Sequence, residues 1–275
     1  MERFKIQNKP QIIADNLIVW NQMMHDHLLK IFPNLDPQTI HILGAPRFDY
    51  FQHTDKIPSS SELRDHLNLP HNSQLIHFAT TELYSLDYVI QAVAAQTPAH
   101  LYASVHPGGD INKHQPYAQK HGVTIRYSFG RQTNSPHPAF SYNPTLENIY
   151  LLVALFKHSD LLINHSSTVA IESFAGDTPV INVKYGRPLD WWRWYHSMVY
   201  RDFQQHYQDI INDGATKIVR NKSELLAAVN NYLKDPAADR AARAQTLKKM
   251  ITITDGTSSQ KILALIKKIT TPLSS

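Results

Sequence analysis

Short apolar runs alternate with longer amphipathic stretches along most of this 275-residue sequence, and this alternation constrains the fold more than any other feature. Each run holds four or five mostly apolar residues, which is typical of a strand buried on both faces. The stretches between the runs have the length and pattern of helices. The sequence therefore predicts an α/β fold with a doubly wound parallel sheet that helices cover on both faces. The predicted strands are residues 75–79, 101–105, 123–127, 161–164 and 179–183, and the predicted helices among them are residues 86–96, 146–156 and 168–175.

The first fifty residues form a smaller pattern of their own. Residues 11–20 contain a short apolar run, residues 21–32 are amphipathic, and residues 39–43 are apolar again. This order predicts one strand, helix, strand unit. It is too short to be a complete α/β domain, so we expect a partial N-terminal unit.

A polar segment separates this unit from the rest of the chain. Residues 52–61 include Pro58 and three consecutive serines, a composition typical of a linker. A helix capped near Ser61 follows. We therefore predict a partial unit at residues 1–55 and a second domain at residues 61–275, with closing helices at 223–233 and 258–269.

Composition excludes several functional classes. Lys and Arg number 27 against 23 Asp and Glu, and no run of like charges marks a nucleic-acid arm. The chain has no Cys, which removes disulfides and thiolate metal sites, and its 16 His residues show no metal-binding spacing. We expect no metal. No segment has the length and apolarity of a membrane span or a secretory signal, so we expect a soluble, cytoplasmic protein.

Polar residues follow the predicted strands where a ligand would bind. Open parallel sheets bind ligands beyond the carboxyl ends of their strands. The candidate binding residues there are Thr80, Thr81, His106, Ser166, Ser167, Thr168 and Glu172.

The richest of these segments leads directly from a strand into a helix. Free backbone N–H groups at a helix start suit a phosphate, and Glu172 lies one turn beyond Thr168 on the same side. Two interpretations remain open here. The serines and Glu172 contact a ligand, or a serine is an ordinary N-cap and Glu172 is a solvated helix residue.

Histidines and aromatic residues supply further candidates. His106 and His165 each follow a strand, where either could donate a hydrogen bond to a phosphate or assist a leaving group. They are our candidate catalytic residues, with loop histidines that cap backbone groups as the alternative. The aromatic segment at residues 191–195 is a candidate either for core packing or for an interface.

The segment at residues 164–181, with its small-residue turn, helix glutamate and strand-opening proline, resembles the donor-binding segment of GT-B glycosyltransferases. Residues 18–20, 40–49 and 105–107 likewise resemble parts of bacterial surface-polysaccharide glycosyltransferases and CDP-glycerol glycerophosphotransferases. The resemblance implies a Rossmann-like, C-terminal half of a GT-B fold. It also implies that the small-residue turn holds the donor phosphates and that Glu172 holds the ribose hydroxyls.

The resemblance implies a transferase that moves a sugar or polyol phosphate from a nucleotide-activated donor to a cell-surface polysaccharide. The partners are then a nucleotide-sugar or CDP-polyol donor and a glycan or lipid-linked acceptor at the inner membrane face. The donor is a substrate, and we expect no tightly bound cofactor.

One departure from the family pattern leaves alternatives open. A complete GT-B enzyme has a full N-terminal domain that binds the acceptor, whereas only about fifty residues precede the predicted linker here. Activity would then require an N-terminal domain or a second chain. The alternatives are a nucleotide-sugar epimerase, which shares the architecture, and a nucleotide-sugar-binding module without catalysis.

Overall fold

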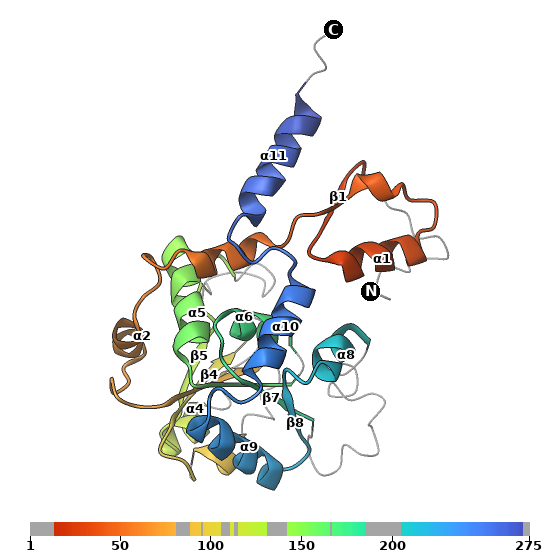
Figure 1. The fold of residues 1–275 in the computed structure, drawn as a ribbon. Coiled ribbons are helices and arrows are strands. Elements are labelled where there is room, and N and C mark those ends of the chain that lie inside the picture. Colours follow the sequence, from red (N-terminus) through yellow and green to blue (C-terminus); the bar gives the residue numbers. More distant parts are fainter. Residues whose placement is uncertain are drawn as a thin grey trace. The chain divides into compact units, whose positions relative to one another are not determined.

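The computed structural model describes residues 14–80, 89–94, 96–105, 111–112, 115–130, 142–165, 167–184 and 205–271. The chain divides into two compact units (Figure 1). The larger unit is Asp55–Thr246. The smaller unit combines the chain up to Thr54 with the chain from Leu247 onwards.

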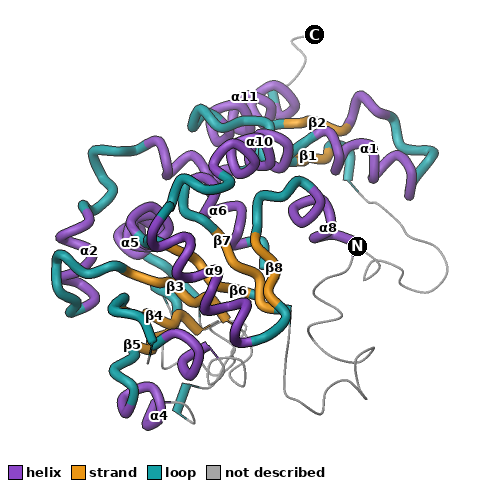
Figure 2. The backbone as a smooth tube through the Cα atoms, turned by 60° about the horizontal axis from the view of Figure 1, so that its bottom comes forward, coloured by secondary structure: helices purple, strands orange, loops and turns teal. Residues whose placement is uncertain are grey.

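A parallel sheet of six strands forms the centre of the larger unit (Figure 2). The strand order is β5-β4-β3-β6-β7-β8, and every neighbouring pair is parallel. The order reverses between β3 and β6, as in doubly wound nucleotide-binding sheets. The predicted α/β fold class is confirmed. The strands are β3 (Leu75–Thr80), β4 (His100–Val105), β5 (Thr124–Tyr127), β6 (Leu161–Asn164), β7 (Val180–Val183) and β8 (Lys217–Val219).

Helices cover both faces of this sheet because successive side chains of a buried strand point to opposite faces. On one face, Leu75 and Tyr102 pack with leucines of α2 and α5. On the other face, Ile76 and Phe78 pack with residues 89–93, α4 and α9. The helices of the unit are α2 (Ser60–Leu67), α4 (Gln115–Lys120), α5 (Leu146–His158), α6 (Val169–Ala175), α8 (Gln205–Asn212), α9 (Lys222–Lys234) and the first part of α10 (Arg240–Met250).

Helix α2 begins slightly earlier than the sequence predicts. Its N-cap is Ser59, whose hydroxyl accepts a hydrogen bond from the Glu62 backbone at 3.3 Å. The Glu62 carboxylate accepts one in return from the Ser59 backbone at 2.7 Å. This reciprocal capping box needs a serine three positions before the glutamate, which Ser61 cannot supply.

The smaller unit joins the two ends of the chain. It contains a parallel pair of strands with Leu17 opposite Ile40, and the Asp49 carboxylate accepts hydrogen bonds from the backbone of Ser258 at 3.1 Å and of Ser259 at 2.7 Å. The elements are β1 (Leu17–Val19), α1 (Gln22–Ile31), the 3-10 helices η2 (Pro37–Thr39) and η3 (Pro46–Gln52), β2 (Ile40–Ile42) and α11 (Ser258–Thr270).

These contacts group α11 with the N-terminal residues, whereas the predicted domain limits place the C-terminal helices in the second domain. Asp49 and Ser258 lie 209 positions apart, so no local pattern reveals their contact. The predicted limits of 1–55 and 61–275 differ from the contact units mainly in this respect. They remain a prediction as domain limits.

A histidine lies in the otherwise apolar centre of the sheet. His77 of β3 is 1% exposed, and its Nε2 lies 2.7 Å from the hydroxyl oxygen of Ser104 on β4. Its ring also packs near Phe156, with 5.5 Å between ring centroids. Burial lowers the pKa of His77 from 6.5 to about 3, because the charged ring would lose its hydration.

His77 therefore makes the stability of the fold sensitive to pH. Between its unfolded pKa of 6.5 and its folded pKa of about 3, the unfolded state binds more protons, so stability falls as pH falls. Between about pH 7.5 and about pH 5, the free energy of unfolding should fall by about 2 kcal/mol more in the native chain than in His77→Gln. Urea titrations of both proteins at the two pH values measure this, and equal pH dependence would contradict it.

Candidate functional site

The switch point of the sheet places the predicted site segments on neighbouring strands. Thr80 ends β3 and stands opposite Val105, the last residue of β4. On the other side of β3, Phe78 stands opposite Ile163, so the ends of β3 and β6 also meet. The carboxyl ends of β4, β3 and β6 therefore lie side by side at one edge of the sheet, where doubly wound sheets bind ligands.

Only part of this edge belongs to the described residues. Thr81, His106 and Ser166 lie outside them, and only the backbone of Thr80 is described. The candidate roles of these four residues remain predictions. The aromatic segment at residues 191–195 also lies outside the described part of the chain, as do residues 134–141 of a Pro- and Asn-rich loop that the sequence predicts at residues 134–144.

The turn between β6 and α6 shows weak side-chain capping. Thr168 occupies the N-cap position without a capping hydrogen bond from its side chain. The Ser167 hydroxyl accepts from the Val169 backbone only at 3.5 Å, longer than an ordinary hydrogen bond. The capping interpretation therefore has little support from Ser167 and Thr168.

Glu172 is buried rather than solvated. It is 4% exposed, although it belongs to the first turn of α6, and its neighbours Ile171 and Ser173 are also buried. Burying a carboxylate is costly unless it meets polar partners, so an ordinary surface role is excluded. The predicted contact with ribose hydroxyls is not tested by this observation.

His165 is held in a fixed orientation. It is 8% exposed, and its Nδ1 donates a hydrogen bond to the backbone oxygen of Val183 at 2.9 Å. Its ring lies edge-on to Phe78, with 6.4 Å between ring centroids. The hydrogen bond ties the end of β6 to the end of β7. His165 therefore has at least a structural role, and its catalytic role remains a prediction.

Two buried polar residues near this edge, Asn182 and Tyr207, were not among the sequence candidates. Asn164 and Asn182 stand opposite each other at the ends of β6 and β7, and both are 0% exposed. The hydroxyl of Tyr207, from α8, donates to Asn182 Oδ1 at 3.2 Å. The asparagines at the ends of two apolar runs were a visible signal, but Tyr207 gives none in the sequence.

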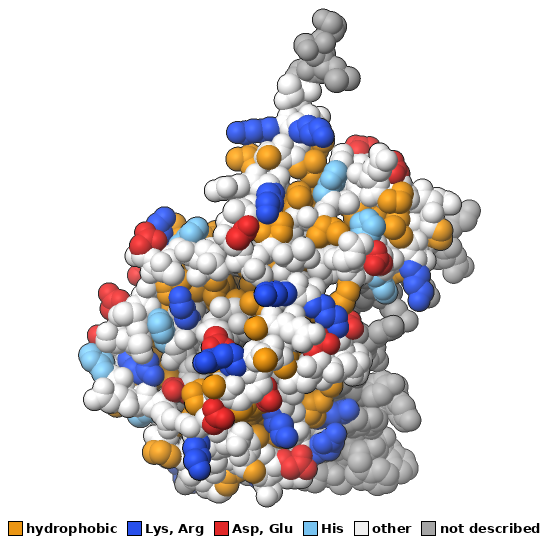
Figure 3. Space-filling model, in the orientation of Figure 1, with side chains coloured by type: hydrophobic (Ala, Val, Ile, Leu, Met, Phe, Trp, Pro, Cys, Tyr) orange, Lys and Arg blue, Asp and Glu red, His pale blue; other side chains and the backbone are white. Residues whose placement is uncertain are grey.

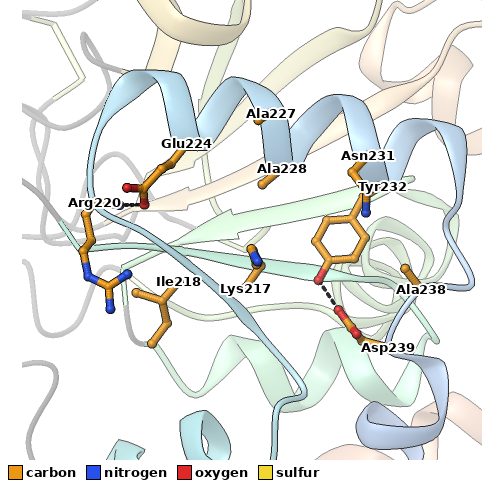
Figure 4. A pocket seen from close by; sticks show the side chains of 10 residues that line it. All are labelled: Lys217, Ile218, Arg220, Glu224, Ala227, Ala228, Asn231, Tyr232, Ala238 and Asp239. Carbon is orange, nitrogen blue, oxygen red and sulfur yellow. Dashed lines mark hydrogen bonds between the residues drawn. The ribbon is translucent and has the colours of Figure 1, made fainter.

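A groove elsewhere in the larger unit is lined by residues of β8, of α9 and of the segment that follows α9 (Figure 4). It has a volume of about 580 Å³ and runs beside β8, the last strand on one side of the sheet. Glu224 accepts a hydrogen bond there from the Arg220 backbone at 2.9 Å, and Tyr232 donates to Asp239 at 2.6 Å. Its lining carries charges of both signs and includes none of the predicted site residues.

Within the described residues, no three His, Asp or Glu side chains are placed together to hold a metal ion. The expectation that the site uses no metal remains a prediction. Among the helices of the described ranges, none has the length and apolarity needed to cross a bilayer.

A known family model matches part of the chain. Residues 140–268 match the family model of CDP-glycerol:poly(glycerophosphate) glycerophosphotransferases. A search of curated protein sequences found no match. The matched residues include β6, α6 and β7, and therefore the turn at the switch point.

Solved structures share the fold at low sequence identity. A variant of the wall teichoic acid polymerase TagF soaked with CDPG superposes with a TM-score of 0.60 and 19% identity, covering 92% of this chain and 56% of TagF. The S. aureus protein MnaA, solved with UDP, gives a TM-score of 0.58 and 16% identity. The match covers 96% of this chain and 63% of MnaA. A putative UDP-N-acetylglucosamine 2-epimerase from Listeria monocytogenes gives 0.57 and 16%, covering 93% and 60%.

The fold is thus a Rossmann-like half of the GT-B type. The resemblance predicted from the sequence is confirmed: residues 140–268 match the glycerophosphotransferase family model, and the solved structures share the fold. It spans little more than half the length of TagF.

Proposed function

We propose that this chain is the donor-binding half of a transferase that moves a polyol phosphate from a CDP-activated donor to a cell-surface polymer. The observation that supports this most is the position of the family match. Residues 140–268 match glycerophosphotransferases, and they include the turn at the switch point of the sheet. This turn is where a doubly wound sheet is expected to bind a nucleotide.

In this proposal the donor diphosphate lies beyond the ends of β4, β3 and β6. Thr80 with Thr81, His106, and Ser166 to Thr168 contact its phosphates, and Glu172 accepts hydrogen bonds from the ribose. An acceptor hydroxyl attacks the phosphorus of the polyol phosphate. The bond between this phosphorus and the oxygen that bridges the two phosphates then breaks. CMP leaves with that oxygen and its electron pair, and the acceptor proton passes to a base. Hydrogen bonds from His106 or His165 would stabilise the charge of the leaving group.

Completion by another domain is part of the proposal. In the smaller unit, a two-stranded parallel sheet leaves Ile18 40% exposed, although parallel sheets are usually covered on both faces. Figure 3 shows apolar side chains exposed along α11 beside lysines, and Leu263 there is 52% exposed. A further Rossmann-like domain, in the same polypeptide or a second chain, would cover these residues and bind the acceptor. Its absence would leave a nucleotide-binding module without catalysis.

The proposed location follows from the acceptor. A glycan that grows on a lipid carrier is reached from the cytoplasm at the inner membrane face. We therefore place the protein in the cytoplasm, acting at that face. Lys261, Lys267 and Lys268 of α11, on a helix with no acidic side chain, are consistent with proximity to anionic lipids.

Calorimetry with CDP, CDP-glycerol, UDP and GDP tests the donor. We expect the cytidine nucleotides to bind at least about tenfold more tightly than the others, a difference that one or two base-specific hydrogen bonds can supply. A preference for UDP would favour the epimerase alternative. No binding of any nucleotide to the folded chain would contradict the proposal.

A further inference from the structure

The carboxyl ends of β6 and β7 are joined by polar groups that are buried in the larger unit. Asn182 lies in β7 between Ile181 and Val183, which pack into the apolar core, so its side chain points to the opposite face. It is 0% exposed. Its Oδ1 accepts the hydrogen bond from Tyr207, and its Nδ2 has no hydrogen-bond partner among the described residues.

A buried amide of this kind is a poor way to stabilise a sheet. A hydrogen bond between neutral groups contributes little net stability, whereas an amide hydrogen atom left without a partner is costly. A leucine at this position would avoid that cost. The arrangement is better explained by what it holds in place, because buried polar networks fix one geometry more sharply than apolar packing does.

What it holds is the start of the proposed donor-binding turn. Asn182 stands directly opposite Asn164, the last residue of β6. The next residue along each strand continues the link, since His165 donates through Nδ1 to the Val183 backbone oxygen at 2.9 Å. Ser166 to Thr168 follow immediately in the chain.

We infer that Tyr207 is a positioning residue for nucleotide binding, which acts through Asn182 on the turn between β6 and α6. Tyr207 is 0% exposed and comes from α8, beyond the end of β7 in the chain. Its hydroxyl fixes the Asn182 side chain, and the paired ends of β6 and β7 carry this constraint to His165 and the serines after it. The inference rests on the proposed function, because the turn must hold the nucleotide for its position to matter.

Tyr207→Phe tests the inference, with Tyr232→Phe as a matched control. Each change removes one buried tyrosine hydroxyl that donates to a neighbouring side chain, and Tyr232, with its partner Asp239, lies in the groove beside β8. We expect Tyr207→Phe to weaken CDP binding by about fivefold to tenfold, and Tyr232→Phe to change it by less than about twofold. Calorimetry at a temperature where all the proteins are folded measures both.

Two further measurements keep the inference separate from the proposed function. Without any ligand, backbone amides of residues 165–169 should exchange hydrogen faster in Tyr207→Phe than in the native chain, and at the native rate in Tyr232→Phe. Asn182→Leu should weaken CDP binding as Tyr207→Phe does. The variant that carries both changes should bind CDP no more weakly than either single variant. Unchanged exchange, equal losses in the two tyrosine variants, or additive losses in the double variant would overturn the inference. Failure of the native chain to bind CDP would instead contradict the proposed function.

Discussion

Glu172→Gln should weaken CDP binding by about ten- to a hundredfold, corresponding to about 1.5 to 3 kcal/mol, if Glu172 accepts hydrogen bonds from the ribose hydroxyls. The carboxylate accepts stronger hydrogen bonds than the neutral amide that replaces it. Gln preserves the size of the side chain and its helix propensity. The burial of Glu172 in α6 makes a solvated role untenable, so a near-zero effect is not the expected result.

A deoxyribose nucleotide provides the control for this prediction. The native chain should bind the deoxyribose nucleotide more weakly than CDP. Glu172→Gln should bind the two nucleotides with nearly equal affinity, because both changes remove the same contact. Calorimetry on the two proteins, each with the two nucleotides, gives the coupling free energy between Glu172 and the ribose hydroxyl. Additive losses would show that Glu172 affects binding by another route, even if nucleotide binding itself is confirmed.

Gly176→Ala should lower the free energy of unfolding by about 3 kcal/mol or more. A Cβ at Gly176 would lie 2.5 Å from the backbone oxygen of Phe156 and 2.8 Å from its carbonyl carbon. These are backbone atoms at the end of α5, so they cannot rotate away as a side chain can. The added Cβ therefore forces α5 and α6 apart. Helix α6 is the helix that carries Glu172.

Gly214→Ala is the matched control for backbone strain. Gly214 has a φ of +70°, and no heavy atom lies within 4 Å of a Cβ built there. The substitution should cost only about 1 kcal/mol, from the left-handed backbone conformation. Urea unfolding of both variants compares the two costs. A loss at Gly176 no larger than that at Gly214 would show that the close approach to α5 is not tight in solution.

Gly176 also shows how a correct prediction can have a different cause. The sequence predicts that the helix at residues 168–175 stops at Gly176, and α6 does end at Ala175. The usual reason would be a left-handed glycine just beyond the helix. Here Gly176 has a φ of −85°, and Asp177 takes the left-handed conformation with a φ of 59°. A glycine is needed at position 176 because a side chain there would collide with the backbone of Phe156.

Five of the six strands in the described sheet were predictable, because burial on both faces leaves a direct mark on composition. The helices α4, α8 and α10 were not predicted. Residues 161–164 form β6 as predicted, and β3 extends the predicted strand by one residue. The strand β8 was missed, since its three residues at the edge of the sheet include the exposed Lys217 and form no apolar run.

Features that depend on contacts between distant residues could not be predicted. The Asp49 carboxylate that caps α11 and the partnership of His77 with Ser104 join segments with no local pattern in common. The same holds for Tyr207 and Asn182, which only the folded sheet brings together. The edge of the sheet where we propose the site was predictable from the sequence, but the buried residues beneath it were not.

A crystal structure of the chain with CDP would show directly where the nucleotide binds. We predict that the diphosphate lies beyond the carboxyl ends of β3 and β6, against the turn that follows Asn164, with the ribose facing Glu172. CDP bound in the groove beside β8, or at any position away from these two strand ends, would contradict the account.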